Sequence, residues 1–386
     1  MTIEGKYSKY GIDVKPIQKM RRCTKCVLPH TMPFIEFDEG GVCNYCRTYK
    51  KHETKDVGTL LSLADRLRKK NGGKDSLAFF SGGRDSSYGL HYMVKELGLN
   101  PIAYSYRWGM ETDIILRNQK RMCDALGVEL VGVDANITRK RDNIRKNIVA
   151  WLKKPDLGMV VLFTAGDKQF FYHGNRLKKR YGLDSIFLTT NPFERTHFKV
   201  GFGGIKPAIF NTDALLDSYL EKLGYSEKSK LAGYYLKQYA ANPAYINASL
   251  WDTFGATLSN FVIPHEYTRL FDYVKWNEKE VDGVLADRYG WEKSPYQEGT
   301  WRIGDGTAPF YNYVFYLVAG FTENDTLRSN QIREGMMTRA EAMELIFRDN
   351  APSFEPMQWY FDVLGLDMEV VLDRVNEIPR LYERTL

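Results

Sequence analysis

A short stretch of the chain combines glycines, serines and an aspartate in a way that favours anion binding. Ser81-Gly82-Gly83-Arg84-Asp85-Ser86-Ser87 follows the apolar run 77–80 and leads into residues with helical spacing. The glycines allow backbone N–H groups to turn toward a ligand, and a helix N-terminus adds partial positive charge. The serines add hydroxyl donors, and Asp85 could hold magnesium against phosphates. The stretch predicts a phosphate-binding loop; a tight structural turn is the alternative.

Four cysteines form a second group with a clear chemistry. Cys23 and Cys26 form one Cys-x2-Cys pair, and Cys43 and Cys46 form another. Four thiolates can surround one zinc ion tetrahedrally, and this spacing is typical of such sites. The zinc would be structural, because four thiolates leave no open position for a substrate. Free buried thiols and an iron–sulfur cluster are the alternatives.

The bulk composition indicates a folded chain without a membrane span. The 386 residues suggest two domains, or one large domain with an appendage, and 44% are hydrophobic. The net charge of +6 suits an anionic small molecule as well as nucleic acid. No apolar run reaches about 18 residues, and the N-terminus lacks the apolar core of a signal peptide. We therefore expect a cytoplasmic protein with no membrane partner.

The hydrophobic pattern predicts an α/β fold with a parallel sheet. Residues 1–20 are interpreted as a leader, 21–54 as the zinc-binding module, 55–205 as the α/β domain and 206–386 as a mostly helical C-terminal region. The predicted strands are 77–80, 101–108, 128–135 and 185–190, and the predicted helices are 57–70, 87–98, 113–127 and 141–154. Residues 160–164 fit either a strand or the start of a helix.

The glycine-rich stretch is neither of two common nucleotide-binding motifs. No Gly-Lys-Ser/Thr follows at the spacing of a Walker A loop, and the Gly-x-Gly-x-x-Gly fingerprint is missing. Ser-Gly-Gly-x-Asp-Ser between a strand and a helix resembles the PP-loop of the ATP pyrophosphatases, which include NAD synthetase, asparagine and GMP synthetases and tRNA-modifying ligases. The resemblance implies a PP-loop (adenine nucleotide alpha-hydrolase-like) fold, with ATP cleaved between its α- and β-phosphates and AMP transferred to a substrate oxygen.

The resemblance also assigns roles to individual residues. It implies that ATP is bound by Ser81, Gly82, Gly83, Asp85, Ser86 and Ser87, with Asp85 and Ser86 taking part in catalysis. Adenosine is expected at the end of the next strand, near Tyr106 and Trp108, which are equally well explained as core aromatics.

The wider sequence resembles the N-acetyl sugar amidotransferases of lipopolysaccharide O-antigen and related surface-sugar biosynthesis. The similarity lies in the order of the modules and in the segments 164–198 and 298–346, and it covers roughly residues 20–350. It implies conversion of an acetamido group on an acidic, nucleotide-linked sugar into an acetamidino group. The amide oxygen would attack the α-phosphorus of ATP, and ammonia would then displace AMP.

Further candidate residues follow from these two segments. Thr164, Gly166 and Lys168 are placed near the ATP phosphates or the adenylated oxygen, with Lys168 as a catalytic candidate; a helix cap explains Thr164 as well. The candidates for sugar contacts are Asn191, Glu194, Arg195, Lys199 and Asp305. A solvated loop and, for Asp305, a simple turn are the alternatives. Arg328 and Arg333 either meet phosphate or pair with Glu323 and Glu334 on the surface.

The source of ammonia is expected to be outside this chain. A glutaminase needs an activated cysteine, but residue 2 is threonine and Cys123 is the one cysteine outside the two pairs. Cys123 lies mid-helix and fits a buried structural thiol better than a nucleophile. The resemblance implies a separate partner similar to the glutaminase subunit of imidazole glycerol phosphate synthase, with a cyclase-like subunit as a further candidate.

Two other functions compete with the amidotransferase. One is an RNA-modifying PP-loop enzyme, such as a tRNA thiolase, whose zinc module grips RNA. Thiolation usually needs cysteines outside a zinc site, and this chain offers Cys123 alone. The other is a binding protein built on a zinc ribbon, with a loop that has lost its function. The binding protein is not favoured, because Gly82, Gly83, Asp85 and Ser86 are all present.

Overall fold

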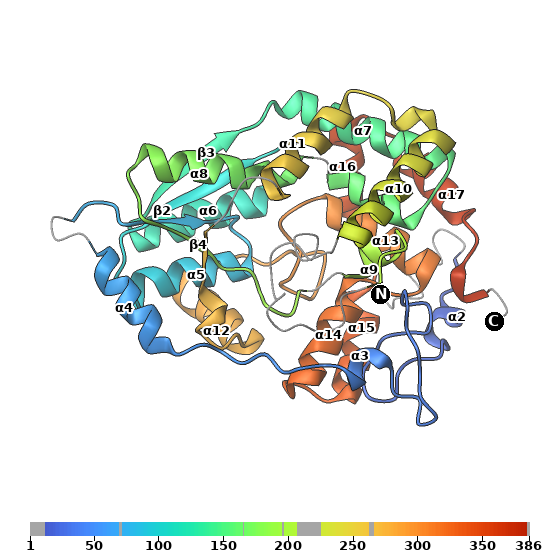
Figure 1. Ribbon diagram of the computed structural model, residues 1–386, viewed down its shortest axis with the longest axis horizontal. Helices are drawn as coiled ribbons and strands as arrows, with labels where there is room; N and C mark the ends of the chain where they lie inside the picture. The colour runs from blue at the N-terminus through green and yellow to red at the C-terminus, as the bar shows by residue number, and fades with distance from the viewer. Residues whose placement is uncertain are drawn as a thin grey trace.

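A five-stranded parallel sheet forms one half of the molecule (Figure 1). The computed structural model describes residues 12–68, 72–164, 166–194, 197–206, 225–261 and 266–383. The strand order is β3-β2-β1-β4-β5, and every neighbouring pair is parallel. The strands are β1 (Ser76–Phe79), β2 (Ile102–Arg107), β3 (Glu129–Asp134), β4 (Ser185–Leu188) and β5 (Thr268–Arg269). The predicted α/β class with a parallel sheet is confirmed.

Helices cover both faces of the sheet, as the buried strands require. Side chains alternate between the two faces of a strand, so Leu77 and Phe79 of β1 face one way, and Ala78 and the following Phe80 face the other. The first pair packs on α8 (Phe170–Arg180). The second pair belongs to a core shared with α4 (Val57–Leu67), α5 (Arg84–Lys95), α6 (Asp113–Leu126) and α12 (Glu278–Tyr289).

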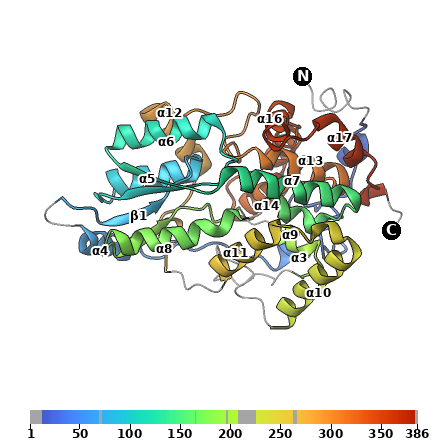
Figure 2. The same cartoon turned by 90° about the horizontal axis from the view of Figure 1, so that it is seen from above.

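The other half of the molecule is helical and has its own apolar core (Figure 2). Trp151, Phe163, Phe310 and Phe361 lie at its centre, with aromatic rings stacked or edge to face. The helices of this half are α7 (Ile137–Lys153), α9 (His197–Gly201), α10 (Tyr225–Ala241), α11 (Ser249–Phe261), α13 (Thr307–Ala319), α14 (Glu323–Glu334), α15 (Arg339–Asp349), α16 (Phe354–Leu364) and α17 (Met368–Asn376).

Short elements connect these larger ones. The short α-helices are α2 (Lys15–Gln18) and α3 (Asn44–Arg47). The 3-10 helices are η1 (Leu157–Thr164), η2 (Asp167–Gln169), η4 (Pro243–Tyr245), η5 (Leu270–Asp272) and η6 (Leu381–Glu383). Residues 160–164 thus belong to a 3-10 helix rather than a strand.

The two halves interleave along the chain. Helix α7 precedes residue 205, yet it packs on η1, α16 and α17 in the helical half. Strand β5 and α12 follow residue 206, yet they join the sheet and pack against β4 and α5. The cavity described below therefore draws residues from 79–194 and from 300–305. None of the helices among the described residues is both long and apolar enough to cross a membrane.

Candidate functional site

The glycine-rich loop joins β1 to α5 in a conformation that needs its glycines. Gly82 has φ +81°, and a side chain there would meet the carbonyl oxygen of Ile115 and the side chain of Gln119. The carbonyl of Gly82 accepts a hydrogen bond of 3.1 Å from the indole N–H of Trp291. Gly83 is the N-cap of α5, so the first turn of that helix begins at Arg84. The loop is fixed by packing on α6 and by Trp291.

The serines of the loop differ in where they point. Ser81 Oγ lies 3.0 Å from Ser86 Oγ and accepts a 3.3 Å hydrogen bond from the backbone N–H of Gly83. Both hydroxyls lie at the wall of a cavity. Ser87 is fully buried in α5 and does not line that cavity. Two of the three predicted hydroxyl donors thus reach the same space.

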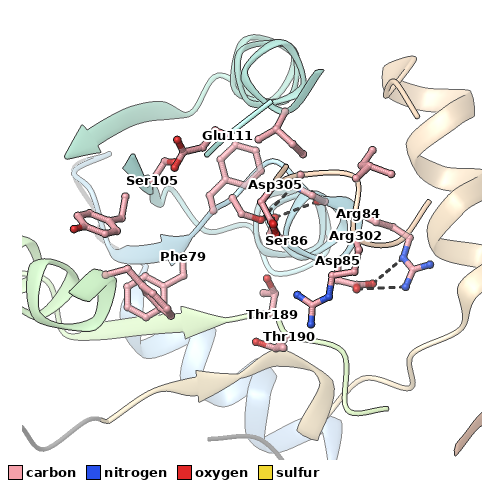
Figure 3. A pocket seen from close by; sticks show the side chains of 18 of the residues that line it. Phe79, Arg84, Asp85, Ser86, Ser105, Glu111, Thr189, Thr190, Arg302 and Asp305 are labelled. Atoms are coloured by element: carbon pink, nitrogen blue, oxygen red, sulfur yellow. Dashed lines mark hydrogen bonds and ion pairs between the residues drawn. The ribbon is translucent and has the colours of Figure 1, made fainter. Parts of the chain in front are cut away.

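The cavity has a volume of about 380 Å³ and lies beyond the carboxyl ends of β1, β2 and β4 (Figure 3). The strand order reverses between β1 and β4, and open parallel sheets bind ligands at this kind of reversal. The predicted site residues that line the cavity are Ser81, Gly83, Asp85, Ser86, Tyr106, Trp108, Asn191, Glu194 and Asp305. Gly82 shapes the loop from behind the wall.

Arg84 and Asp85 form a buried ion pair at this wall. The Arg84 side chain is almost completely buried; its Nε lies 3.2 Å from Asp85 Oδ1, and its NH1 lies 2.9 Å from Glu278 Oε1. Trp276 donates its indole N–H to Asp85 Oδ1 at 2.7 Å. Burial opposes the charge of Arg84, but Asp85 and Glu278 raise its pKa above the usual value. Figure 3 shows the Arg84 side chain beside Asp85.

Glu194 brings a second carboxyl group to Asp85. It follows β4 and lies on a turn in which the N–H of Glu194 donates to the carbonyl of Asn191 at 3.3 Å. Burial, together with the charge of Asp85 and a hydrogen bond to it, raises the pKa of Glu194 to about 8. Arg302 opposes this rise from 3.9 Å. Two carboxyl groups in contact at a cavity wall are a donor set that suits a divalent cation.

Arg302 is the other guanidinium at the cavity, and it rests on a buried carboxylate. Its backbone has φ +56°, which is uncommon for a residue with a side chain. Its Nε lies 3.2 Å from Glu323 Oε1, and Lys199 Nζ lies 3.1 Å from Glu323 Oε2. Burial alone would raise the pKa of Glu323, but Arg302 and Lys199 lower it to about 2. Lys199 is thus paired with Glu323 and does not line the cavity.

The remaining predicted residues at the cavity are held by the protein itself. Tyr106 donates its hydroxyl to Gln169 Oε1 at 3.1 Å and stacks on His173. The backbone N–H of Trp108 donates to Glu111 at 2.8 Å. Asp305 Oδ1 accepts from the N–H groups of Thr307 and Ala308 and so caps α13.

Asn191 is fully buried at the base of the turn that carries Glu194. Its Oδ1 accepts a hydrogen bond of 2.8 Å from the N–H of Phe193, and Asn330 Nδ2 donates to the carbonyl of Phe193 at 2.9 Å. Among the described residues its Nδ2 has no hydrogen-bond partner. The Asn191 and Asn330 side chains thus hold the backbone of the turn at Phe193.

Three predicted residues lie away from the cavity. Thr164 donates its hydroxyl to the carbonyl of Val161, and Gly166 has φ +83° next to the ammonium of Lys140. The Lys168 ammonium is half exposed and pairs with Asp167 at 3.7 Å. Asp167 and Phe170 line the cavity, but Lys168 does not. Arg195 lies outside the described residues.

The four cysteines meet in one buried cluster remote from the sheet. Their sulfur atoms all lie within 4.8 Å of one another, and no disulfide joins them. The Cys23 and Cys46 sulfurs are 3.9 Å apart, and those of Cys26 and Cys43 are 3.8 Å apart. Sulfurs at ~2.3 Å from a central zinc would be ~3.8 Å apart in a tetrahedron. The cluster could therefore hold a metal ion.

Helices α14 and α15 cover the cysteine cluster. Arg333 of α14 donates to the sulfurs of Cys46 and Cys26 at 3.3 and 3.2 Å. Arg339 of α15 donates to the backbone carbonyls of Cys23 and Cys26 at 3.0 Å. Backbone N–H groups of Lys25, Cys26 and Cys43 donate to Cys23 Sγ. The guanidinium of Arg333 offsets part of the negative charge that a four-thiolate metal site carries.

Arg328 and Arg333 are both buried rather than on the surface. Arg328 pairs with Glu278 at 2.5 Å and with Asp349 at 2.8 Å, so it supports the carboxylate that holds Arg84. The expected surface pairs with Glu323 and Glu334 do not form. Glu323 is paired with Arg302 and Lys199, and Glu334 accepts hydrogen bonds from Tyr49 and His52.

Sequence reasoning missed several side chains at the cavity. They come from segments far from the loop in sequence, and they are Arg302 and Thr300 at the wall, with Trp276, Glu278 and Trp291 behind it. Arg302 lies in the segment 298–346, which carries part of the resemblance. An arginine in that segment is not by itself a reason to predict a site residue. Neither models of known protein families nor curated proteins gave a match to this chain.

Proposed function

We propose that this chain is an ATP-dependent amidotransferase. It would convert an acetamido group of an acidic, nucleotide-linked sugar into an acetamidino group and release AMP and pyrophosphate. The observation that carries the proposal is the Ser-Gly-Gly-x-Asp-Ser loop, which opens onto the cavity where the strand order reverses between β1 and β4.

Binding of the triphosphate is assigned to the loop. The first turn of α5 presents backbone N–H groups that have no partner within the helix, and its dipole favours negative charge. The Ser81 and Ser86 hydroxyls lie at the same wall. These fixed donors would stabilise the charge that develops on departing pyrophosphate. Tyr106 and Trp108 at the end of β2 would border the adenosine.

The charge of the cavity requires a cation beside the triphosphate. The lining carries five carboxyl groups, of Asp85, Glu111, Asp167, Glu194 and Asp305, against the guanidiniums of Arg84 and Arg302. Even when Glu194 keeps its proton, as its pKa of about 8 implies at neutral pH, the remaining carboxyl groups outnumber the guanidiniums, so a triphosphate would be repelled. Asp85 and Glu194 are the residues that would hold magnesium, because their carboxyl groups are in contact and face the cavity. Bound magnesium would neutralise charge on the phosphates.

The choice of ammonia over sulfur as the nucleophile is supported by the cysteines. Cys123 is buried in α6, and burial raises the pKa of its thiol to about 12, so it is a poor nucleophile. The other four cysteines are engaged in the cluster. We therefore assign the ammonia supply to a separate glutaminase or to free ammonia, and we do not assign thiolation of RNA to this chain.

Zinc is the metal we assign to the cysteine cluster. The sulfur separations match a tetrahedral four-thiolate site, and the cluster has no position left for a substrate. The role assigned to zinc is structural. It would join the segment 21–54 to α14 and α15, whose arginines contact the cysteines.

The first experiment identifies the products. The purified protein is incubated with ATP, magnesium, an ammonium salt and a panel of acetamido sugar nucleotides, and the mixture is analysed by mass spectrometry. We expect AMP, pyrophosphate and a sugar in which NH has replaced one oxygen. Formation of ADP and phosphate would contradict adenylation, and AMP formation with every sugar left unchanged would contradict amidination.

A control separates the two half-reactions. Without ammonium, the protein should still release pyrophosphate when the correct sugar is present, because adenylation of the amide precedes attack by ammonia, while AMP stays bound to the amide oxygen. A sugar nucleotide without an acetamido group should give no pyrophosphate. Pyrophosphate release that is equal with and without the acetamido group would show that the amide oxygen is not the acceptor.

A further inference from the structure

Helix α11 presents its apolar side chains outward and its polar side chains inward. Trp251 is 75% exposed and Phe254 is 56% exposed, and Leu258 continues the same face at helical spacing. On the opposite face Asp252 and Ser259 are almost fully buried. This is the reverse of an ordinary surface helix, whose apolar face packs on the core. The outward face of α11, with Trp251, Phe254 and Leu258, is called the α11 ridge below.

The buried polar face explains why α11 is oriented in this way. Asp252 accepts hydrogen bonds from Lys140 at 2.8 Å and from Asn143 at 2.6 Å, both on α7. Ser259 Oγ donates to the carbonyl of Lys168 and accepts from the N–H of Tyr172. These contacts fix the helix rotation, so the ridge is exposed by the fold and not by fraying.

Further exposed apolar side chains lie beside the ridge. Ile246 precedes α11, Tyr172 lies on α8 next to Ser259, and Leu236 lies on α10 with 69% of its side chain exposed. Helices α8, α11 and α10 lie along the same side of the molecule (Figure 2). Single exposed apolar residues are ordinary on protein surfaces, but a group of this size marks an interaction surface.

Basic side chains surround the ridge. Arg139 of α7 approaches Asp252 at 3.7 Å with 65% of its side chain exposed, and Arg176 of α8 lies over the Tyr172 ring. The other exposed basic residues on α7, α8 and α10 are Arg145, Lys153, Lys179, Arg180, Lys228, Lys230 and Lys237, and Lys168 of η2 is exposed as well. Of the acidic groups on these elements, Asp167 contacts Lys168, Asp252 contacts Lys140 and Asp142 contacts Arg145 and Lys146, while Glu227 of α10 has no ion pair among the described residues.

We propose that the α11 ridge and its basic surround bind the surface of an anionic phospholipid membrane. Aromatic and aliphatic side chains would enter the boundary between headgroups and acyl chains, and the lysines and arginines would contact the negative headgroups. A second copy of this chain would bring one basic surround against another. Nucleic acid suits the basic residues but offers no partner for Leu236, Ile246 and Leu258. The proposal does not depend on the proposed enzymatic function.

This mode of binding differs from spanning a membrane. The sequence predicts no membrane partner because no apolar run is long enough to span a bilayer. The α11 ridge and the apolar side chains beside it come from α11, α8, α10 and Ile246, so no single long apolar run marks them. A peripheral contact is compatible with the finding that none of the described helices could cross a membrane.

Vesicle sedimentation tests the proposal. The intact protein is mixed with vesicles of phosphatidylcholine alone, or of phosphatidylcholine with phosphatidylglycerol, at low and at high salt. We expect cosedimentation with the anionic vesicles at low salt, weaker binding at high salt and little binding to phosphatidylcholine. Protein that remains in the supernatant with anionic vesicles at low salt would overturn the proposal.

Matched variants locate the contact. W251S/F254S should reduce the bound fraction about tenfold, and R176E/K179E should reduce it and remove its salt dependence. The controls are L61S/V370S, which changes exposed apolar residues elsewhere, and K120E on α6. Each variant is first shown by circular dichroism and size exclusion to be folded. Equal binding by W251S/F254S and the wild type contradicts the proposal.

Size exclusion with light scattering tests whether the α11 ridge is instead an interface between two copies of this chain. If the wild type is a dimer and W251S/F254S is a monomer, the ridge is an interface between copies and the proposal is wrong. Binding of the wild type to single-stranded RNA in preference to anionic vesicles would also contradict it. A shift of tryptophan emission to shorter wavelength on vesicle addition, absent in W251F, would support insertion of Trp251 directly.

Discussion

Asp85 is held at the cavity wall by neighbours that fix its carboxylate. Trp276 donates to Oδ1, Arg84 contacts both oxygens, and Glu194 lies against the same group. These contacts restrict rotation of the Asp85 side chain, so its carboxylate oxygens stay in one position at the cavity wall. This arrangement suits a residue that must hold a cation in a defined position beside a phosphate chain.

Replacing Asp85 by asparagine removes the negative charge and nearly keeps the shape of the side chain, so it tests the charge alone. In D85N the Oδ1 acceptor for Trp276 remains, while the negative charge is lost. We expect AMP formation to fall by about a hundredfold or more because a fixed charge at the reacting phosphates is gone. The assay is AMP release under saturating ATP. D282N is the matched control: Asp282 accepts a hydrogen bond from Thr300 near Arg84 but does not line the cavity. Equal losses in the two variants would contradict a specific role for Asp85.

Glu194 should make the stability of the protein fall as pH rises. Burial and Asp85 raise the pKa of Glu194 from 4.5 to about 8 in the folded chain. Between about pH 5 and about pH 8 the unfolded chain has lost this proton and the folded chain keeps it, so the free energy of unfolding falls by about 1.4 kcal/mol per pH unit at most. E194Q removes this contribution.

Urea titrations over that pH range measure the effect. The advantage of E194Q over the wild type should grow steadily as pH rises, because the variant has no carboxyl group to ionise. The control is E298Q, which changes an exposed carboxyl group of the same type. If the free energies of unfolding of the wild type and E194Q change in parallel with pH, Glu194 does not keep its proton in the folded chain over this range.

Helix α14 is the element that connects the two chemical sites. It is strongly polar, yet nine of its twelve residues are buried, which means that its polar groups are used inside the protein. Glu323 at its start supports Arg302, Arg328 in its middle supports Glu278, and Arg333 at its end contacts the cysteine sulfurs. One rigid helix thus carries supports for the cavity and for the cysteine cluster.

Replacing Arg333 should weaken metal retention. R333L removes two hydrogen bonds to sulfur and a positive charge beside the thiolates. We expect metal affinity to fall by about tenfold to a hundredfold, measured by competition with a chelator and by metal analysis after dialysis. R333K should recover part of the affinity, because it restores the charge but not the two-pronged geometry.

A charge change elsewhere on the neighbouring helix provides the control. R348L removes a partly exposed arginine of α15 that pairs with Asp349 and does not contact the cysteines. Its metal content should equal that of the wild type. Equal metal retention in R333L and R348L would show that Arg333 is not needed by the cluster. Iron in place of zinc in the wild type would contradict the assignment of the metal.

At the scale of the whole molecule, local features could be predicted from sequence and long-range ones could not. The strands and helices around the loop follow from apolar spacing, and Thr338 and Glu341, three residues apart, form the capping box that begins α15. The two cysteine pairs are also local patterns, and their meeting in one cluster follows from spacing. Each of these features depends on neighbours a few residues away in the chain.

The supports of the cavity depend on contacts that sequence spacing does not contain. The sequence does not place the Arg84 side chain, and the structure buries it against Glu278, 194 positions away. The polar composition of α14 suggests an exposed helix, because only the tertiary structure supplies its buried partners. Membership of α7 in the helical half, and of β5 in the sheet, likewise results from packing rather than periodicity.

The distance along the chain between the cysteines and their covering arginine has a consequence for biosynthesis. Arg333 is 287 residues after Cys46 and 307 after Cys26. The four cysteines leave the ribosome long before helix α14, which covers them in the folded protein, has been synthesised. During that interval the nascent chain exposes its cysteines to oxidants and to competing metals. Early capture of the ion would protect them, and completion of the cavity must wait until the last third of the chain has emerged.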